Sequence, residues 1–135
     1  MRDTGLVTTK QLNRWYLGAR FCAGGVWLYE GLWMKILRPD PHELDIVRHF
    51  SFLGLGGADL MKGIGALECL LALGFFSGLI PRSVGIVGSV ALLAMNLTGI
   101  FAGGGTIAAP LGLLIKNTPL WFCMLFYALG TRDRE

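Results

Sequence analysis

The sequence predicts an all-α integral membrane protein, an antiparallel four-helix bundle with a short amphipathic helix in its first outer loop. Of the 135 residues, 53% are hydrophobic and only 16% are charged, and the mean hydropathy is +0.57. The apolar residues gather into stretches long enough to cross a hydrocarbon core about 30 Å thick. Basic residues flank these stretches and form no stripe, so we expect membrane lipid as a partner, and no nucleic acid, despite a net charge of +3.

The first span is expected at about residues 15–37 and contains charged residues inside its apolar stretch. Arg20 and Lys35 are long and lie nearer its two ends, so their charged groups can extend to the membrane interface. Glu30 lies roughly 10 Å from the end at Leu37, too deep for a short carboxylate side chain to reach water. An ionisable group at this depth marks a candidate functional site.

Three more spans are expected at about residues 59–79, 83–101 and 111–130, so residues 1–135 form one transmembrane domain. Between the first two spans, prolines end the helix, and apolar residues at helical spacing predict a short amphipathic helix on the outer surface. At the start of the second span, Asp59 and Lys62 are three residues apart and positioned to pair.

The fourth span is interrupted at residues 116–119, KNTP, where the proline removes one backbone hydrogen bond. A break would leave residues 120–129 too short to span a membrane, so the sequence favours one bent span. It leaves two questions open: whether this span is continuous, and whether the glycine-rich loop 102–110 re-enters the membrane.

The basic residues set the expected orientation. With both termini inside, six basic residues lie on the inner side against two in the outer loops. The inner residues are Arg2, Lys10, Arg14, Arg82, Arg132 and Arg134, and the outer ones are Arg38 and Arg48. We therefore expect a multi-pass protein of the inner (cell) membrane with both termini in the cytoplasm.

Polar residues of all the expected spans fall at a similar depth when each span is counted from its outer end, within a layer about 10 Å thick. These candidate pocket residues are Glu30, Lys35, Lys62, Glu68, Asn96, Lys116 and Asn117. Two interpretations stay open: an ion-pair network facing a pocket open to the outer side, or protonated or paired groups that only hold helices together. Trp27, Tyr29 and Trp33 form a candidate aromatic wall, although tryptophan near the end of a span is more often an interfacial anchor.

Residues for metal or dithiol chemistry are scarce. Cys22, Cys69 and Cys123 are dispersed without a CxxC motif, and no histidine lies in an expected span. We therefore expect no metal site and no covalently bound cofactor.

Three segments resemble the DoxX-like family of small four-span membrane proteins: YEGLWMK (29–35), GALECLLALG (65–74) and GGGTIAAPLGLLIKNTPL (103–120). The resemblance extends over about residues 14–130. It implies an antiparallel four-helix membrane bundle. The family takes its name from a subunit associated with thiosulfate:quinone oxidoreductase, and related proteins are linked to membrane redox or thiol-stress complexes, so the resemblance favours quinone-linked redox work.

Three functional hypotheses follow, and the sequence leaves open whether the protein is an enzyme. The first is a subunit of a membrane redox complex that binds a quinone or a small sulfur compound; Glu30 and Glu68 would then exchange protons, and Lys35 or Lys62 would hold an anionic or carbonyl group. The second is a noncatalytic accessory subunit whose glycine-lined faces pack against larger membrane protein subunits. The third is a small-molecule transporter with a broken fourth helix.

Overall fold

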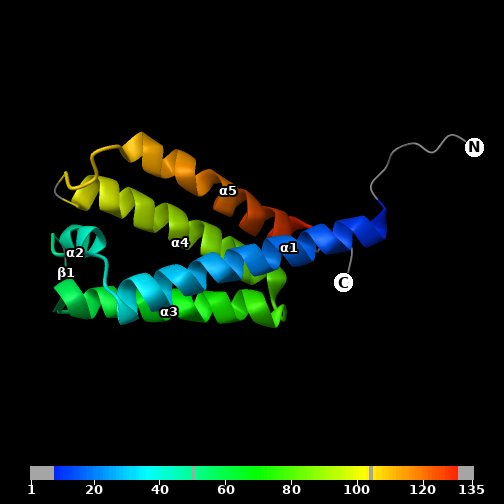
Figure 1. Ribbon diagram of the computed structural model, residues 1–135, viewed down its shortest axis with the longest axis horizontal. Coiled ribbons are helices and arrows are strands. Elements are labelled where there is room, and N and C mark those ends of the chain that lie inside the picture. Colours follow the sequence, from blue (N-terminus) through cyan, green and yellow to red (C-terminus); the bar gives the residue numbers. More distant parts are fainter. Residues whose placement is uncertain (1–7, 50, 104, 131–135) are drawn as a thin grey trace, which may run out of the picture.

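The computed structural model of the protein describes residues 8–49, 51–103 and 105–130, and most of them are helical (Figure 1). The first long helix consists of α1 (Thr9–Leu28) and a π-helix, η1 (Tyr29–Leu37), that continues it without a gap. The other long helices are α3 (Gly57–Ser77), α4 (Pro81–Ala102) and α5 (Pro110–Leu129). Between η1 and α3 lie α2 (Pro41–Val47) and a two-stranded hairpin of β1 (Ser51–Phe52) and β2 (Leu55–Gly56).

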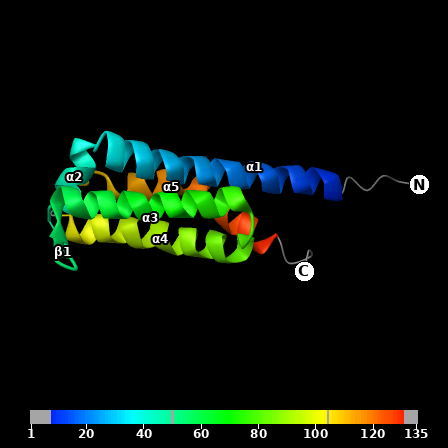
Figure 2. The same cartoon turned by 90° about the horizontal axis from the view of Figure 1, so that it is seen from below.

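The long helices run alternately up and down the bundle (Figures 1 and 2). The first long helix packs against α3 and α5, and α4 packs against the same two helices. The described N-terminal end of α1 and C-terminal end of α5 lie at one end of the bundle, which we call the terminal end. The opposite end is closed by α2, and we call it the α2 end.

The helix faces fit a lipid environment. Three of the described helices, α3, α4 and α5, are long and apolar enough to cross a membrane. On α3 the large side chains of Leu67, Leu70 and Leu73 are 64%, 62% and 60% exposed, as suits contact with lipid tails. The apolar stretch of the first expected span is divided between the end of α1 and η1. The predicted all-α membrane bundle is confirmed.

Local signals fix the helix ends. A capping box begins α1 ahead of the expected residue 15: the Gln11 N–H donates to Thr8 Oγ1 at 3.3 Å, and the Thr8 N–H donates to Gln11 Oε1 at 3.0 Å. At the C-terminal end of α3, Gly78 takes a left-handed conformation with φ 65°, which stops the helix at Ser77. Pro81 is the first residue of α4, where its missing N–H costs nothing.

Helix α5, the fourth expected span, is continuous through its proline. It runs from Pro110 to Leu129 with Pro119 inside, and the Thr118 hydroxyl donates to the Leu114 carbonyl oxygen at 3.1 Å. Pro119 removes one hydrogen bond without ending the helix. The broken helix on which the transporter hypothesis depends is therefore absent from the described residues.

Two buried apolar clusters hold the bundle together. The larger joins all the long helices and consists of Ala23, Trp27, Ala72, Phe75, Val84, Met124 and Tyr127. The smaller fixes α2 to the start of α3 and consists of Val47, Leu60 and Met61. The predicted amphipathic helix is thus present as α2, which buries Val47 and exposes Asp45.

Arg20 joins α1 to the last turn of α3 at the terminal end. Its Nε donates to the Phe75 carbonyl oxygen at 2.7 Å, and its Nη2 donates to the Phe76 carbonyl oxygen. These carbonyls have no donor within their own helix because they belong to its last turn. The guanidinium therefore crosses to α3, whereas the sequence favoured extension to the interface.

Replacing Arg20 by methionine is expected to lower the free energy of unfolding by about 1.5–3 kcal/mol, the usual contribution of a hydrogen bond from a charged group. Denaturant unfolding in detergent micelles measures this, with the exposed Arg14→Met as the matched control. Equal stability of the two variants would contradict the capping role of Arg20.

Candidate functional site

The π-helical turns of η1 change which side chains share a face. The Arg38 N–H donates to the carbonyl oxygen of Trp33, five residues earlier, at 2.8 Å. On an α-helix, residues 30 and 35 would point about 140° apart. Hydrogen bonding over five residues instead places them about one turn apart on the same face. Glu30 Oε2 consequently lies 3.8 Å from Lys35 Nζ.

Lys35 lies among three carboxylates, those of Glu30, Glu43 and Glu68. We call these four charged residues the Lys35 cluster. Its Nζ lies 2.9 Å from Glu43 Oε2 and 3.1 Å from Glu68 Oε2. The side chains of Lys35 and Glu68 are only 6% and 3% exposed, against 28% for Glu43 and 38% for Glu30. Charges buried this deeply are tolerated only when they are paired. The expectation that Lys35 extends to the membrane interface is therefore wrong, because carboxylates from η1, α2 and α3 hold its ammonium inside.

Two glycines allow η1 and α3 to touch backbone to backbone beside this cluster. A Cβ atom on Gly31 would lie 2.6 Å from the Gly65 carbonyl oxygen, and one on Gly65 would lie 2.7 Å from the Gly31 carbonyl oxygen. Only glycine fits at such a distance. The close contact brings Lys35, one turn after Gly31, against Glu68, one turn after Gly65.

Glu43 is the member of the cluster that sequence reasoning missed. It lies in the first turn of α2, which Asp40 caps by accepting the N–H groups of His42 and Glu43, each at 3.0 Å. Depth counting along the spans could not find it, because α2 lies outside them. The sequence feature that points to Glu43 is the amphipathic pattern of α2, which places Glu43 beside the apolar residue Leu44 on the side facing the bundle.

The other candidate pocket residues divide into two groups. Asn96 of α4 and Asn117 of α5 face each other, and Asn117 Nδ2 donates to Asn96 Oδ1 at 3.0 Å. Lys62 and Lys116 are exposed. In the described part of the chain no ion pair joins Lys62 to Asp59, so their expected pairing is not found.

The candidate aromatic wall residues point in different directions. Trp27 is 2% exposed, and its Nε1 donates to Met124 Sδ at 3.2 Å in the core. Tyr29 and Trp33 are 54% and 43% exposed, and the Arg38 guanidinium lies 5.3 Å from the Trp33 ring centre. An exposed tryptophan beside arginine at a helix end fits the interfacial anchor considered for it.

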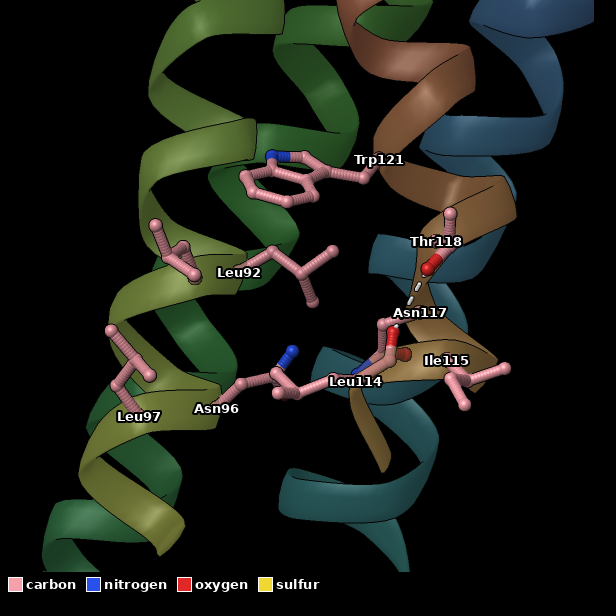
Figure 3. Close-up of a pocket in the computed structure, with 9 residues that line it drawn as sticks. Leu92, Asn96, Leu97, Leu114, Ile115, Asn117, Thr118 and Trp121 are labelled. Atoms are coloured by element: carbon pink, nitrogen blue, oxygen red, sulfur yellow. Dashed lines mark hydrogen bonds between the residues drawn. The ribbon is translucent and has the colours of Figure 1, made fainter. Parts of the chain in front are cut away.

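A groove of about 230 Å³ lies between α4 and α5 beside the asparagine pair (Figure 3). Its apolar lining includes Leu92, Leu97 and Leu114, and Trp121 lies across the hollow from the two amides. Leu97 is 39% exposed, so the groove opens sideways to the lipid-facing surface. Among the described residues, Asn96 Nδ2 donates no hydrogen bond, and it remains available to a ligand.

The family model described as the DoxX-like family matches residues 24–126, well over half of the chain. This chain belongs to the DoxX-like family. The match confirms the resemblance and includes all of the Lys35 cluster and the whole asparagine groove. No curated protein and no solved structure matches the chain.

The chemistry open to this DoxX-like protein follows from these two sites. Within the described residues, no group of three histidine, cysteine or acidic side chains is placed to hold a metal ion, and Cys22, Cys69 and Cys123 are free thiols. The Lys35 cluster offers three carboxyl groups, a kind of group that can bind and release protons. The groove offers an amide donor among apolar walls, the usual composition of a site for a small apolar ligand with a few polar atoms.

Proposed function

We propose that this DoxX-like protein is a small subunit of a quinone-linked membrane redox complex, and that the quinone ring binds in the groove between α4 and α5. The groove carries the proposal. A quinone is a flat ring with two carbonyl oxygens that accept hydrogen bonds, and its apolar tail stays in the lipid. Asn96 supplies an N–H donor, Trp121 supplies an aromatic face, and the leucines exclude water.

Proton handling is assigned to the Lys35 cluster. Reduction of a quinone to its quinol takes up two electrons and two protons, and the groove lining contains no acidic side chain. Glu30 and Glu68 are the proposed exchange groups, and Lys35 holds their negative charge in place. The electrons come from a partner subunit, since the sequence has no paired cysteines to carry them.

The proposed setting is the inner membrane, with four spans and both termini in the cytoplasm. The described ends of α1 and α5 lie at the same end of the bundle, as an even number of spans requires. The excess of basic residues assigned to that side supports its cytoplasmic orientation. The first long helix, residues 9–37, supplies the fourth span.

The double substitution Asn96→Leu with Asn117→Leu is expected to weaken quinone binding about tenfold, because a hydrogen bond in a dry site contributes about 1–1.5 kcal/mol. Short-tailed ubiquinone and menaquinone analogues are titrated into the protein in lipid nanodiscs, with quenching of tryptophan fluorescence as the signal. Ser89→Ala is the matched control, since its buried hydroxyl donates within α4 to Gly85. Absence of binding to the unmodified protein, or equal affinity in the asparagine variant, would reject the groove as the quinone site.

A noncatalytic accessory role is the second candidate, favoured by one face of α1. Gly18 and Gly25 are exposed, and no atom lies within 4 Å of the position of a Cβ on either residue. Exposed glycines on a membrane helix allow a neighbouring helix to approach closely. This role predicts that Gly18→Leu with Gly25→Leu abolishes copurification of a partner, and that the partner complex of the unmodified protein contains no quinone.

A further inference from the structure

The hairpin of β1 and β2 ends in an apolar tip whose side chains are largely exposed. Phe52 and Leu55 lie opposite each other in its ladder, and Leu53 and Gly54 form the two-residue turn between them. The side chains of Leu53 and Phe52 are 85% and 65% exposed, and Leu55 is exposed as well. Residues 51–57, SFLGLGG, contain no charged group. Apolar side chains gathered on a surface in this way mark a contact with something other than water.

The backbone of this turn holds a leucine where leucine is unfavourable. Leu53 has φ 51° and Gly54 has φ 76°, so both residues of the turn are left-handed, as in a type I′ hairpin turn. Asparagine, aspartate or glycine normally occupies the first of these positions, because a larger L-residue is strained there. Among the described residues, Leu53 is the only non-glycine residue with a positive φ. Neither the turn nor contact with water favours leucine here, which points to a role for its apolar side chain.

The position of the hairpin decides what its tip meets. In Figure 2 the hairpin lies crosswise to the long helices at the α2 end, so it points sideways and not away from the bundle along its axis. Both strands contact α3, and β2 runs directly into α3, a helix long and apolar enough to cross a membrane. The tip therefore lies at the level where a span leaves the hydrocarbon core. A segment that points sideways at this level meets lipid.

Two neighbouring surfaces separate lipid from water at the α2 end. Phe101, in the last turn of α4, is 83% exposed, so the lipid-facing surface of the bundle continues to this end. Helix α2 instead carries an exposed ion pair, with Arg48 Nη1 3.2 Å from Asp45 Oδ1. The charged face of α2 suits water and lipid headgroups, whereas the uncharged tip of the hairpin extends the lipid-facing surface.

We propose that the β1–β2 hairpin is a membrane anchor: Phe52, Leu53 and Leu55 insert into the bilayer at the boundary between headgroups and acyl chains. Interfacial helices bury their apolar faces about 5–10 Å deep at this boundary, and the tip is expected at a similar depth. Insertion removes the exposed apolar side chains from water, which offsets the strain at Leu53. It also fixes the segment between η1 and α3 to the membrane surface, at the end where Glu43 of α2 contacts Lys35.

Spin labelling of the full chain in lipid nanodiscs tests the anchor. A nitroxide is attached at Leu53→Cys after the native cysteines have been replaced by alanine. Collisions of the nitroxide with oxygen, which dissolves in lipid, are compared with its collisions with a water-soluble nickel complex. The ratio of oxygen to nickel collisions is expected to be several-fold higher at Leu53→Cys than at Asp45→Cys, on the exposed face of α2. Leu70→Cys, on the exposed apolar face of α3, gives the reference ratio for lipid.

A second label site keeps the test independent of any one variant. Phe52→Cys is expected to give the same high ratio as Leu53→Cys, and a thermal unfolding scan confirms that each labelled variant is folded. Asp45→Cys carries the same nitroxide, so any attraction of the label itself to lipid is common to all sites. The anchor is rejected if the tip positions give the ratio found at Asp45→Cys, because the tip would then lie in water. Exclusion of both reagents from the tip also rejects it, because a protein surface, such as a second copy of this chain, would then cover the tip.

Discussion

Lys35→Met is expected to lower the free energy of unfolding by about 3–5 kcal/mol, the cost of removing one partner from a buried ion pair. Without the ammonium, Glu68 stays 2% exposed among apolar side chains and has no cation to pair with. Glu30 of η1 and Glu43 of α2 would also repel each other, because the ammonium that pairs with both would be gone. The loss therefore comes mainly from the carboxylates left behind and only partly from the lost contacts of the lysine.

Denaturant unfolding in micelles measures this loss, and Lys62→Met is the matched control because Lys62 is exposed on α3. The double variant Lys35→Met with Glu68→Met should recover a large part of the loss, since apolar groups of similar volume replace a buried pair at little cost. Stability of Lys35→Met equal to that of Lys62→Met would show that the cluster does not hold the bundle together.

Gly65→Ala is expected to cost about 1–3 kcal/mol, as is typical when atoms are forced into a packed interior. The new Cβ would meet the Gly31 carbonyl oxygen at 2.7 Å and Lys35 Cβ at 2.9 Å, and backbone cannot move aside as a flexible side chain does. Separation of η1 from α3 would also pull Lys35 away from Glu68, so the substitution should disturb the cluster as well as the packing.

Gly63→Ala, two residues earlier on the same helix, is the matched control. No atom lies within 4 Å of its Cβ position, so alanine there should be neutral or slightly stabilising through helix propensity. Thermal unfolding of both variants in the same detergent gives the comparison. A neutral Gly65→Ala would mean that the two helices do not approach as closely as described.

The sequence predicts the fold well because lipid imposes simple rules on it. Apolar length and the small number of charged residues locate α3, α4 and α5 within a few residues. The largest difference between an expected and an observed helix boundary is at the start of α1. There the capping box of Thr8 and Gln11 extends the helix beyond the apolar stretch. The resemblance to the DoxX-like family agrees with the same arrangement.

The candidate site could be predicted only in part, because depth along a span does not say which way a side chain points. Glu30, Lys35 and Glu68 lie close together, as their similar depth along the spans predicts. The contact between Glu30 and Lys35, however, depends on a π-helix, which an α-helical periodicity does not reveal. Lys62 and Lys116 share that depth and yet face outward. Glu43 was missed because it reaches the cluster from α2, outside every span.

The most direct test of the proposed function is native mass spectrometry of the protein released gently from its own membrane, with quinone extracted and quantified from the same sample. A quinone-linked subunit predicts a stoichiometric redox partner together with about one quinone per chain, and loss of that quinone in the Asn96→Leu, Asn117→Leu variant. A large partner without quinone would instead favour the accessory role. A bare monomer or homo-oligomer without quinone would contradict both.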